Sequence, residues 1–244
     1  MEKERKELYF KADLQTKEFI YSGITFKEFL KYSSFVIENI ILLKANYVGD
    51  KYEYGFDLLE GRKSVEMLAK ENVYSYGDFC FVDYETSGIV AQLNDEEIAQ
   101  LLFAAHMFRP LKSMFFEKLN NQFLYLAHDD GLFCKLYLRN EIDFVTILCN
   151  KITDYVHQKY KINCLDIPET LKRIILNMAT KGICLDLEEI KKNNFVVRFY
   201  IIGEVSNIDD LLNNFQTIKN KDVEWMDLIY QDGRWITNQE IECL

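Results

Sequence analysis

Three consecutive polar side chains, His128, Asp129 and Asp130, are the residues of this sequence best suited to chemistry. An imidazole and two carboxylates can bind a divalent metal ion or transfer protons. A hairpin turn explains the same residues, because Asp-Asp-Gly is typical of a tight turn and Gly131 permits a positive φ. Neighbouring turn residues also need distant ligands before they can enclose one ion. The pattern therefore favours a turn, with a metal site as the alternative.

A second candidate is the pair of acids Asp83 and Glu85, at the end of the apolar run of residues 79–82. In a strand these acids share one face, and active sites often use strand ends. A strand that simply ends in polar residues at the surface has the same pattern, and a carboxylate pair needs a pocket before its pKa values shift. We favour the surface interpretation. His106 lies among apolar residues at helical spacing, so we expect a core or half-buried side chain there.

The sequence contains none of the motifs GxGxxG, P-loop, GxSxG, HExxH or EF-hand. We therefore predict no catalytic residue and no cofactor. Aromatic residues make up 14% of the chain, and such residues are enriched in protein interfaces as well as in cores. The aromatic residues on predicted hairpins are candidates for contact with a partner protein, although each also suits a core: Tyr52, Tyr54, Trp225, Tyr230 and Trp235.

Composition limits the class of protein. The chain of 244 residues is 49% hydrophobic and has a formal net charge of −10 without a basic stripe, which disfavours nucleic-acid binding. Its best apolar candidate, residues 35–48, is interrupted by charged and amide side chains, so no membrane span of ~18 residues is expected. The six cysteines form no CxxC pair, and the charged start lacks the apolar region of a secretory signal. We expect a soluble protein of the reducing cytoplasm.

Hydrophobic periodicity predicts antiparallel hairpins that alternate with amphipathic helices, which is an α+β fold. We expect hairpins at residues 40–58 and 123–138 and around Asp232-Gly233, and a central strand at 79–84. Capping patterns and one proline predict where helices begin. The predicted helix starts are Thr25, Ser64, Asn94, Asn140 and Pro168.

The stretch of residues 160–168 is the best candidate for a domain boundary. It divides the chain into an α+β unit with two hairpins and a long helix, residues 1–162, and a smaller α+β unit, residues 163–244. Ile162, Leu165 and Ile167 within the stretch also suit burial. A single domain is therefore the alternative.

Two segments carry a resemblance to a known family: Gly77 to Tyr84, and Tyr125 to Gly131 with Lys135-Leu136-Tyr137 after it. They resemble an uncharacterised family of soluble proteins from Bacillus-type bacteria, and the resemblance covers most of the chain. Some members of that family carry the label oxalate:formate antiporter. This sequence does not support the label, because it contains no apolar run long enough to cross a bilayer. The resemblance implies no functional residues.

These observations favour a non-enzymatic protein-binding factor, of a regulatory or immunity type. The acidic composition, the aromatic hairpins and the missing catalytic motifs support this interpretation, and it predicts a large apolar patch or groove. The alternative is a metal-dependent hydrolase that uses His128, Asp129 or Asp130 with remote ligands. A homo-oligomer whose hairpin edges pair is a further possibility.

Overall fold

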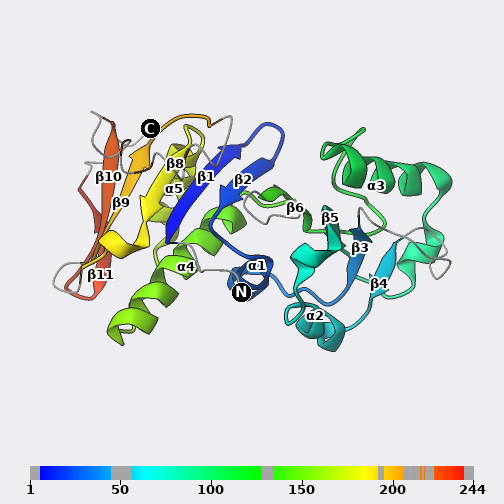
Figure 1. Ribbon diagram of the computed structural model, residues 1–244, viewed down its shortest axis with the longest axis horizontal. Helices are drawn as coiled ribbons and strands as arrows, with labels where there is room; N and C mark the ends of the chain where they lie inside the picture. Colours follow the sequence, from blue (N-terminus) through cyan, green and yellow to red (C-terminus); the bar gives the residue numbers. More distant parts are fainter. Residues whose placement is uncertain are drawn as a thin grey trace.

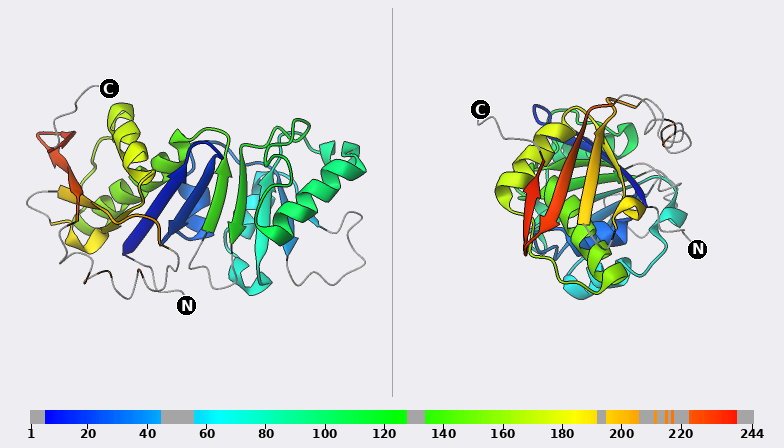
Figure 2. Two further views of the ribbon diagram at one scale, coloured as in Figure 1. Left: turned by 90° about the horizontal axis from the view of Figure 1, so that it is seen from above. Right: turned by 90° about the vertical axis from the view of Figure 1, so that its left-hand side faces the viewer.

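The computed structural model describes residues 6–44, 56–127, 134–191, 195–205 and 223–238, together with residues 211, 215 and 217. Its strands form an 11-stranded antiparallel sheet in the order β11-β10-β9-β8-β1-β2-β7-β6-β5-β3-β4. Figure 1 and the left panel of Figure 2 show these strands following one another along the long axis of the molecule. The strands are β1 (Glu7–Asp13), β2 (Glu18–Ser22), β3 (Ile40–Lys44), β4 (Asp57–Leu59), β5 (Phe79–Asp83), β6 (Phe123–Ala127), β7 (Cys134–Leu138), β8 (Ile183–Asp186), β9 (Phe195–Ile201), β10 (Trp225–Gln231) and β11 (Arg234–Thr237).

Helices cover both faces of the sheet. Apolar side chains of α1, α2, α4 and α5 pack on one face, in a core that includes Phe10 and Phe19 of the first hairpin. On the opposite face, α3 packs through Leu101 and Ala104 against β3, β5 and β6. The helices are α1 (Phe26–Tyr32), α2 (Arg62–Leu68), α3 (Asp95–Met107), α4 (Ile142–Tyr160) and α5 (Glu169–Ala179), and the 3-10 turns are η1 (Val73–Tyr76), η2 (Ile89–Gln92) and η3 (Leu187–Glu189).

Aromatic rings pack the first helix, α1, against the sheet. Phe26 of α1 stacks on Phe81 of β5 with ring centroids 4.2 Å apart, and it meets the ring of Tyr125 edge-on at 5.0 Å. Phe29, one turn further along α1, lies 5.0 Å from Phe123. Each such pair contributes ~0.5–1.5 kcal/mol beyond the apolar area that it buries. The short helix α1 is therefore held by tertiary packing rather than by its own length.

The predicted α+β fold is confirmed, and so are its hairpins. β3 pairs with β4, β6 with β7, and β10 with β11, each in antiparallel register. In the last turn Asp232 has φ 52° and Gly233 has φ 75°, as a two-residue turn between twisted strands requires. The predicted central strand is β5, which is buried on both faces and lies between β3 and β6.

Two of the predicted helix starts are confirmed in detail. Thr25 and Asn94 each form a complete capping box, with Glu28 and Glu97 respectively. The prediction for Ser64 is wrong, because α2 begins at Arg62 and the Ser64 hydroxyl donates to the carbonyl of the preceding turn.

The prediction for His106 is also wrong, because this side chain is exposed near the end of α3. Only a narrow strip of α3, at Leu101 and Ala104, is fully buried against the sheet. The apolar residues around His106 therefore occupy a wider part of the α3 surface than the sheet covers.

Strands from both sides of the suggested boundary at residue 162 belong to the same sheet. β1 pairs with β2 on one side and with β8 on the other, and α4 and α5 pack together across the boundary. The division into residues 1–162 and 163–244 stays a prediction. Within the described ranges, no helix combines the length and the apolar character that crossing a bilayer demands.

Candidate functional site

The three residues that the sequence favours most for chemistry, His128, Asp129 and Asp130, lie outside the described residues. The described residues on either side of this segment, Ala127 of β6 and Cys134 of β7, pair with each other. Among the described residues, no group of three or more His, Cys, Asp or Glu side chains is arranged to hold a metal ion.

Asp83 and Glu85 have separate structural partners. The Asp83 carboxylate, only 7% exposed, accepts the backbone N–H groups of Gln122 at 2.9 Å and Phe123 at 2.8 Å. Burial raises the pKa of Asp83 to about 7, while these amides and the guanidinium of Arg139 act in the opposite direction. Glu85 instead accepts a hydrogen bond from a neighbouring asparagine side chain. Asp83 therefore anchors the start of β6 and does not pair with Glu85.

Of the aromatic candidates, Trp225, Tyr230 and Trp235 lie on the β10–β11 hairpin, and Tyr52 and Tyr54 lie outside the described residues. Trp235 is 4% exposed, and its indole N–H donates to the Leu165 carbonyl at 2.7 Å. The Tyr230 ring packs on Trp235 at 4.9 Å. Trp225 is 41% exposed beneath the guanidinium of Arg198, which lies 4.1 Å from the ring centroid. Trp225 thus retains surface for a partner, whereas Trp235 and Tyr230 hold the segment before α5.

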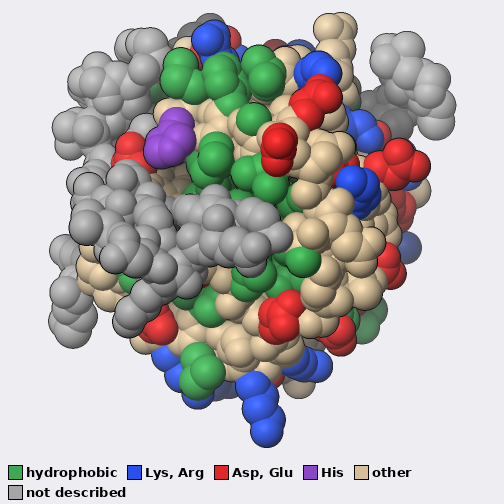
Figure 3. Space-filling view, turned by 90° about the vertical axis from the view of Figure 1, so that its right-hand side faces the viewer, with side chains coloured by type: hydrophobic (Ala, Val, Ile, Leu, Met, Phe, Trp, Pro, Cys, Tyr) green, Lys and Arg blue, Asp and Glu red, His purple; other side chains and the backbone are tan. Residues whose placement is uncertain are grey.

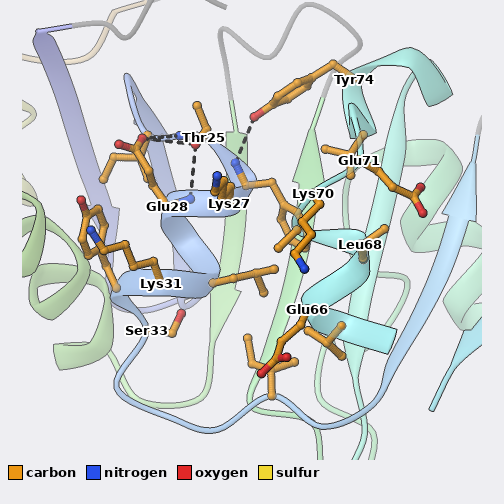
Figure 4. A pocket seen from close by; sticks show the side chains of 18 of the residues that line it. Thr25, Lys27, Glu28, Lys31, Ser33, Glu66, Leu68, Lys70, Glu71 and Tyr74 are labelled. Carbon is orange, nitrogen blue, oxygen red and sulfur yellow. Dashed lines mark hydrogen bonds between the residues drawn. The ribbon is translucent and has the colours of Figure 1, made fainter. Parts of the chain in front are cut away.

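An open groove of about 1730 Å³ on the face that carries α1 and α2 is a feature that suits a ligand. Figure 4 shows α1 on one side and α2 with η1 on the other, with side chains of both helices directed into the space between them. We call it the α1–α2 groove. Its apolar lining includes Phe26 and Leu30 of α1, Val36 of the following loop, and Val65 and Leu68 of α2.

The α1 wall is fixed by its capping box and by a buried ion pair. The Thr25 hydroxyl accepts the Glu28 N–H at 3.2 Å, and the Glu28 carboxylate accepts the Thr25 N–H at 3.0 Å. The other carboxylate oxygen of Glu28 pairs with the ammonium of Lys151 in α4. The Lys151 side chain is 2% exposed and that of Glu28 is 18% exposed. Local sequence thus starts α1, and a distant charge fixes it against α4.

A second set of contacts joins the end of α1 to α4. The Lys31 ammonium and the Tyr32 hydroxyl both donate to one Asp154 carboxylate oxygen, at 2.7 Å and 2.6 Å. The amide of Asn150 donates to the Tyr32 carbonyl at 2.9 Å. These contacts continue the attachment from the Glu28–Lys151 pair to the C-terminal end of α1. The α1 wall of the groove is therefore tied to the longest helix at both ends.

The opposite wall is connected to α1 at one end of the groove. The hydroxyl oxygen of Tyr74, in η1, accepts the backbone N–H of Phe26 at 3.0 Å (Figure 4). The start of α2 is held by Asn39, whose side-chain oxygen accepts the Gly61 N–H at 3.0 Å. Both walls are thus hydrogen-bonded to parts of the fold that lie far away in sequence. A groove built in this way is largely formed before any ligand arrives.

Two lysines in the groove have no charged partner. Lys27 of α1 and Lys70, just after α2, have no carboxylate within 4 Å among the described residues, and Figure 4 shows both side chains between the two helices. Of the nearby acids, Glu66 forms an ion pair with Arg62 at 3.1 Å, whereas Glu71 accepts a tyrosine hydroxyl and keeps its negative charge. This part of the groove therefore presents positive charge beside an apolar surface.

The end of the molecule that carries α3 presents a second apolar area. Figure 3 shows hydrophobic side chains gathered on this face. Met107 and Leu111 at the end of α3 are exposed, and Phe103 is half-buried.

The chain matches no model of a known protein family, no curated protein and no solved structure. The resemblance carried by residues 77–84 and 125–131 therefore stays a prediction. The groove was not predictable from the sequence, because its walls come from segments whose side chains have the pattern of an ordinary helix surface. The only local signal was the capping box at Thr25, which places the start of α1.

Proposed function

We propose that this chain is a non-enzymatic accessory factor, of a regulatory or immunity type, that binds a segment of another protein in the α1–α2 groove. One observation carries the proposal: a preformed, open groove of about 1730 Å³ with an apolar lining and a charged rim. Pockets for small molecules usually measure ~300–1,000 Å³ and enclose most of the ligand. A groove that exceeds this volume and is open to solvent suits a peptide segment better than a metabolite.

The arrangement of the lining supports peptide binding. Val36, on the rim, is 71% exposed, and Leu30 and Phe35 are partly exposed beside it. Apolar side chains along a groove are the feature by which helix-in-groove and extended-peptide recognition obtain affinity. Because α1 is already fixed to α4 through Glu28 and Lys151, little conformational entropy is lost from this wall on binding.

Site-specific photo-crosslinking tests the proposal. A photoreactive amino acid is placed at Val36, which lines the groove, or at Met67, which is 58% exposed on α2 but does not line it. In cells that naturally produce the protein, we expect a distinct crosslinked partner from position 36 and none from position 67. The crosslink should disappear when Leu30→Asp is added, because a carboxylate then enters the apolar lining.

Two results would contradict the proposal. One is equal crosslinking from both positions, which indicates non-specific contact. The other is a crosslink between two copies of this chain, which indicates that the groove is a surface for self-association. Circular dichroism of the Leu30→Asp variant checks that loss of the crosslink does not come from unfolding.

A further inference from the structure

We infer that the segment bound by the α1–α2 groove is acidic where it crosses between α1 and α2, with carboxylates that pair with Lys27 and Lys70. The inference rests on the proposed function and adds the chemistry of the partner. It follows from the distribution of paired and unpaired charges in the groove, taken together with the apolar lining beside them.

Between the two helices, more lysines than acids lack an ion-pair partner among the described residues. Lys27 and Lys70 have no ion-pair partner in the described part of the chain, whereas Lys31 is bound to Asp154 at 2.7 Å. Of the acids beside them, Glu28 pairs with a buried lysine and Glu66 with Arg62, whereas Glu71 accepts a tyrosine hydroxyl and has no cationic partner among the described residues. A ligand carboxylate placed here would therefore meet two ammonium groups without a carboxylate partner against one such acid.

The part of the groove that borders β1 and η3 carries acidic side chains as well as a lysine, and this gives the partner a direction. Glu7 at the start of β1 and Glu188 of η3 line this end, and neither has an ion-pair partner among the described residues. Lys6 lies nearby, with its ammonium 5.3 Å from the ring centroid of Tyr155. A segment with its acids over Lys27 and Lys70 should thus carry neutral or basic residues toward β1.

The net charge of −10 does not prevent an acidic segment from binding. At physiological ionic strength the Debye length is ~8 Å, so distant surface acids are largely screened while direct pairs in the groove are not. A nucleic acid is less well matched, because its phosphates form a continuous line of charge and would also meet Glu7 and Glu188. The apolar side chains beside Lys27, notably Leu30, favour a ligand that alternates acids with apolar residues.

Selection from a displayed library of short random peptides tests the inference without knowledge of the natural partner. The bait proteins are the full chain and its variants Lys27→Glu, Lys70→Glu and the double variant. Lys63→Glu is the matched control, because Lys63 is an exposed residue of α2 that makes the same change of charge but does not line the groove. Fluorescence anisotropy then measures the affinity of the selected peptides for each protein.

We expect the wild-type chain to enrich peptides that combine Asp or Glu with Leu, Ile or Phe. Lys27→Glu and Lys70→Glu should each weaken these peptides by about tenfold, and Lys63→Glu by less than about twofold. The double variant should lose the acidic preference and enrich Lys and Arg instead. A single-stranded oligonucleotide and vesicles of anionic phospholipid, tested in the same assay, should bind more weakly than the selected peptides.

The contradicting outcomes separate the inference from the proposed function. Selected peptides without an excess of acids, or equal losses in Lys70→Glu and Lys63→Glu, would overturn the acidic partner and leave peptide binding intact. Tighter binding of the oligonucleotide or the vesicles, abolished in the double variant, would overturn it in favour of a phosphate ligand. Failure of the wild-type chain to enrich any peptide would contradict the proposed function itself.

Discussion

The buried pair between Glu28 and Lys151 predicts an unequal response to removal of either charge. Glu28→Gln removes the carboxylate charge but keeps a side chain that can serve the capping box with Thr25. It removes the Glu28 charge from the Lys151 ammonium, which is 2% exposed. Lys151→Met removes the buried charge and keeps the length of the apolar stem. It leaves Glu28 18% exposed and still hydrogen-bonded at the start of α1.

The magnitudes follow from what each substitution leaves behind. Loss of one partner of a buried ion pair costs ~3–5 kcal/mol. Lys151 keeps other interactions after the loss of Glu28, including electrostatic attraction to Asp154, so we expect the lower limit, about 3 kcal/mol, for Glu28→Gln. Lys151→Met should cost only ~1–2 kcal/mol, because Glu28 keeps its hydrogen bonds and some water. The double variant should resemble Lys151→Met, since neither charge remains.

Urea denaturation at neutral pH, followed by circular dichroism, measures these differences as shifts in the midpoint at constant slope. A stability loss of about 3 kcal/mol leaves a typical domain folded, because total stabilities are ~5–15 kcal/mol. The reasoning is refuted if Lys151→Met destabilises the protein more than Glu28→Gln does. It is also refuted if the double variant is less stable than both single variants. Removal of the Lys151 charge would then not relieve the destabilisation caused by the loss of the Glu28 charge.

Three further predictions concern the rest of the fold. Burial raises the pKa of Asp83 from its usual range to about 7, so charging this carboxylate between about pH 4 and 7 costs the folded state up to roughly 4 kcal/mol. The free energy of unfolding should therefore fall as pH rises through this window, and Asp83→Asn should flatten this pH profile in urea titrations. Gly182→Ala should lower the melting temperature far more than Gly233→Ala, because both glycines have positive φ but only at Gly182 would a Cβ clash with the Gly203 carbonyl. Trp235→Phe should reduce the free energy of unfolding by ~1–2 kcal/mol, measured by urea denaturation, because the Leu165 carbonyl loses its indole donor and the smaller ring buries less apolar surface. An unchanged midpoint would contradict this prediction.

Features that depend on neighbouring residues were predictable from the sequence. The capping boxes at Thr25 and Asn94 join residues three positions apart, so the sequence contains the whole interaction. The hairpin at Asp232-Gly233 likewise needs only its own turn residues and the alternation of the flanking strands. The α+β fold follows from repetition of such local units.

Features that depend on distant partners were not predictable. The start of α2 is set by Gly61, whose amide is bound by Asn39 in another segment, and not by Ser64. The exposure of His106 depends on how little of α3 the sheet covers. In both cases the local pattern fits more than one arrangement, and tertiary contacts select among them.

The α1–α2 groove is also a feature that depends on distant partners. Its walls meet because β3 and β5 pair side by side and carry α1 and α2 to the same face, and the single sequence does not specify that pairing. In sequence Lys27 and Lys70 resemble ordinary surface lysines, and only the structure shows that neither has a carboxylate partner among the described residues. Lys151 similarly falls near the apolar stripe of α4 without any sign of the glutamate that accounts for its burial.

Hydrogen exchange with and without a selected peptide tests most directly whether the α1–α2 groove is the binding site. The account predicts that peptide binding slows exchange in residues 26–37 and 62–74, and that Lys27→Glu with Lys70→Glu abolishes this protection. Exchange in α3 and around Trp225 should not change. Protection confined to α3 or to the β10–β11 hairpin, with the groove unaffected, would contradict the central claim.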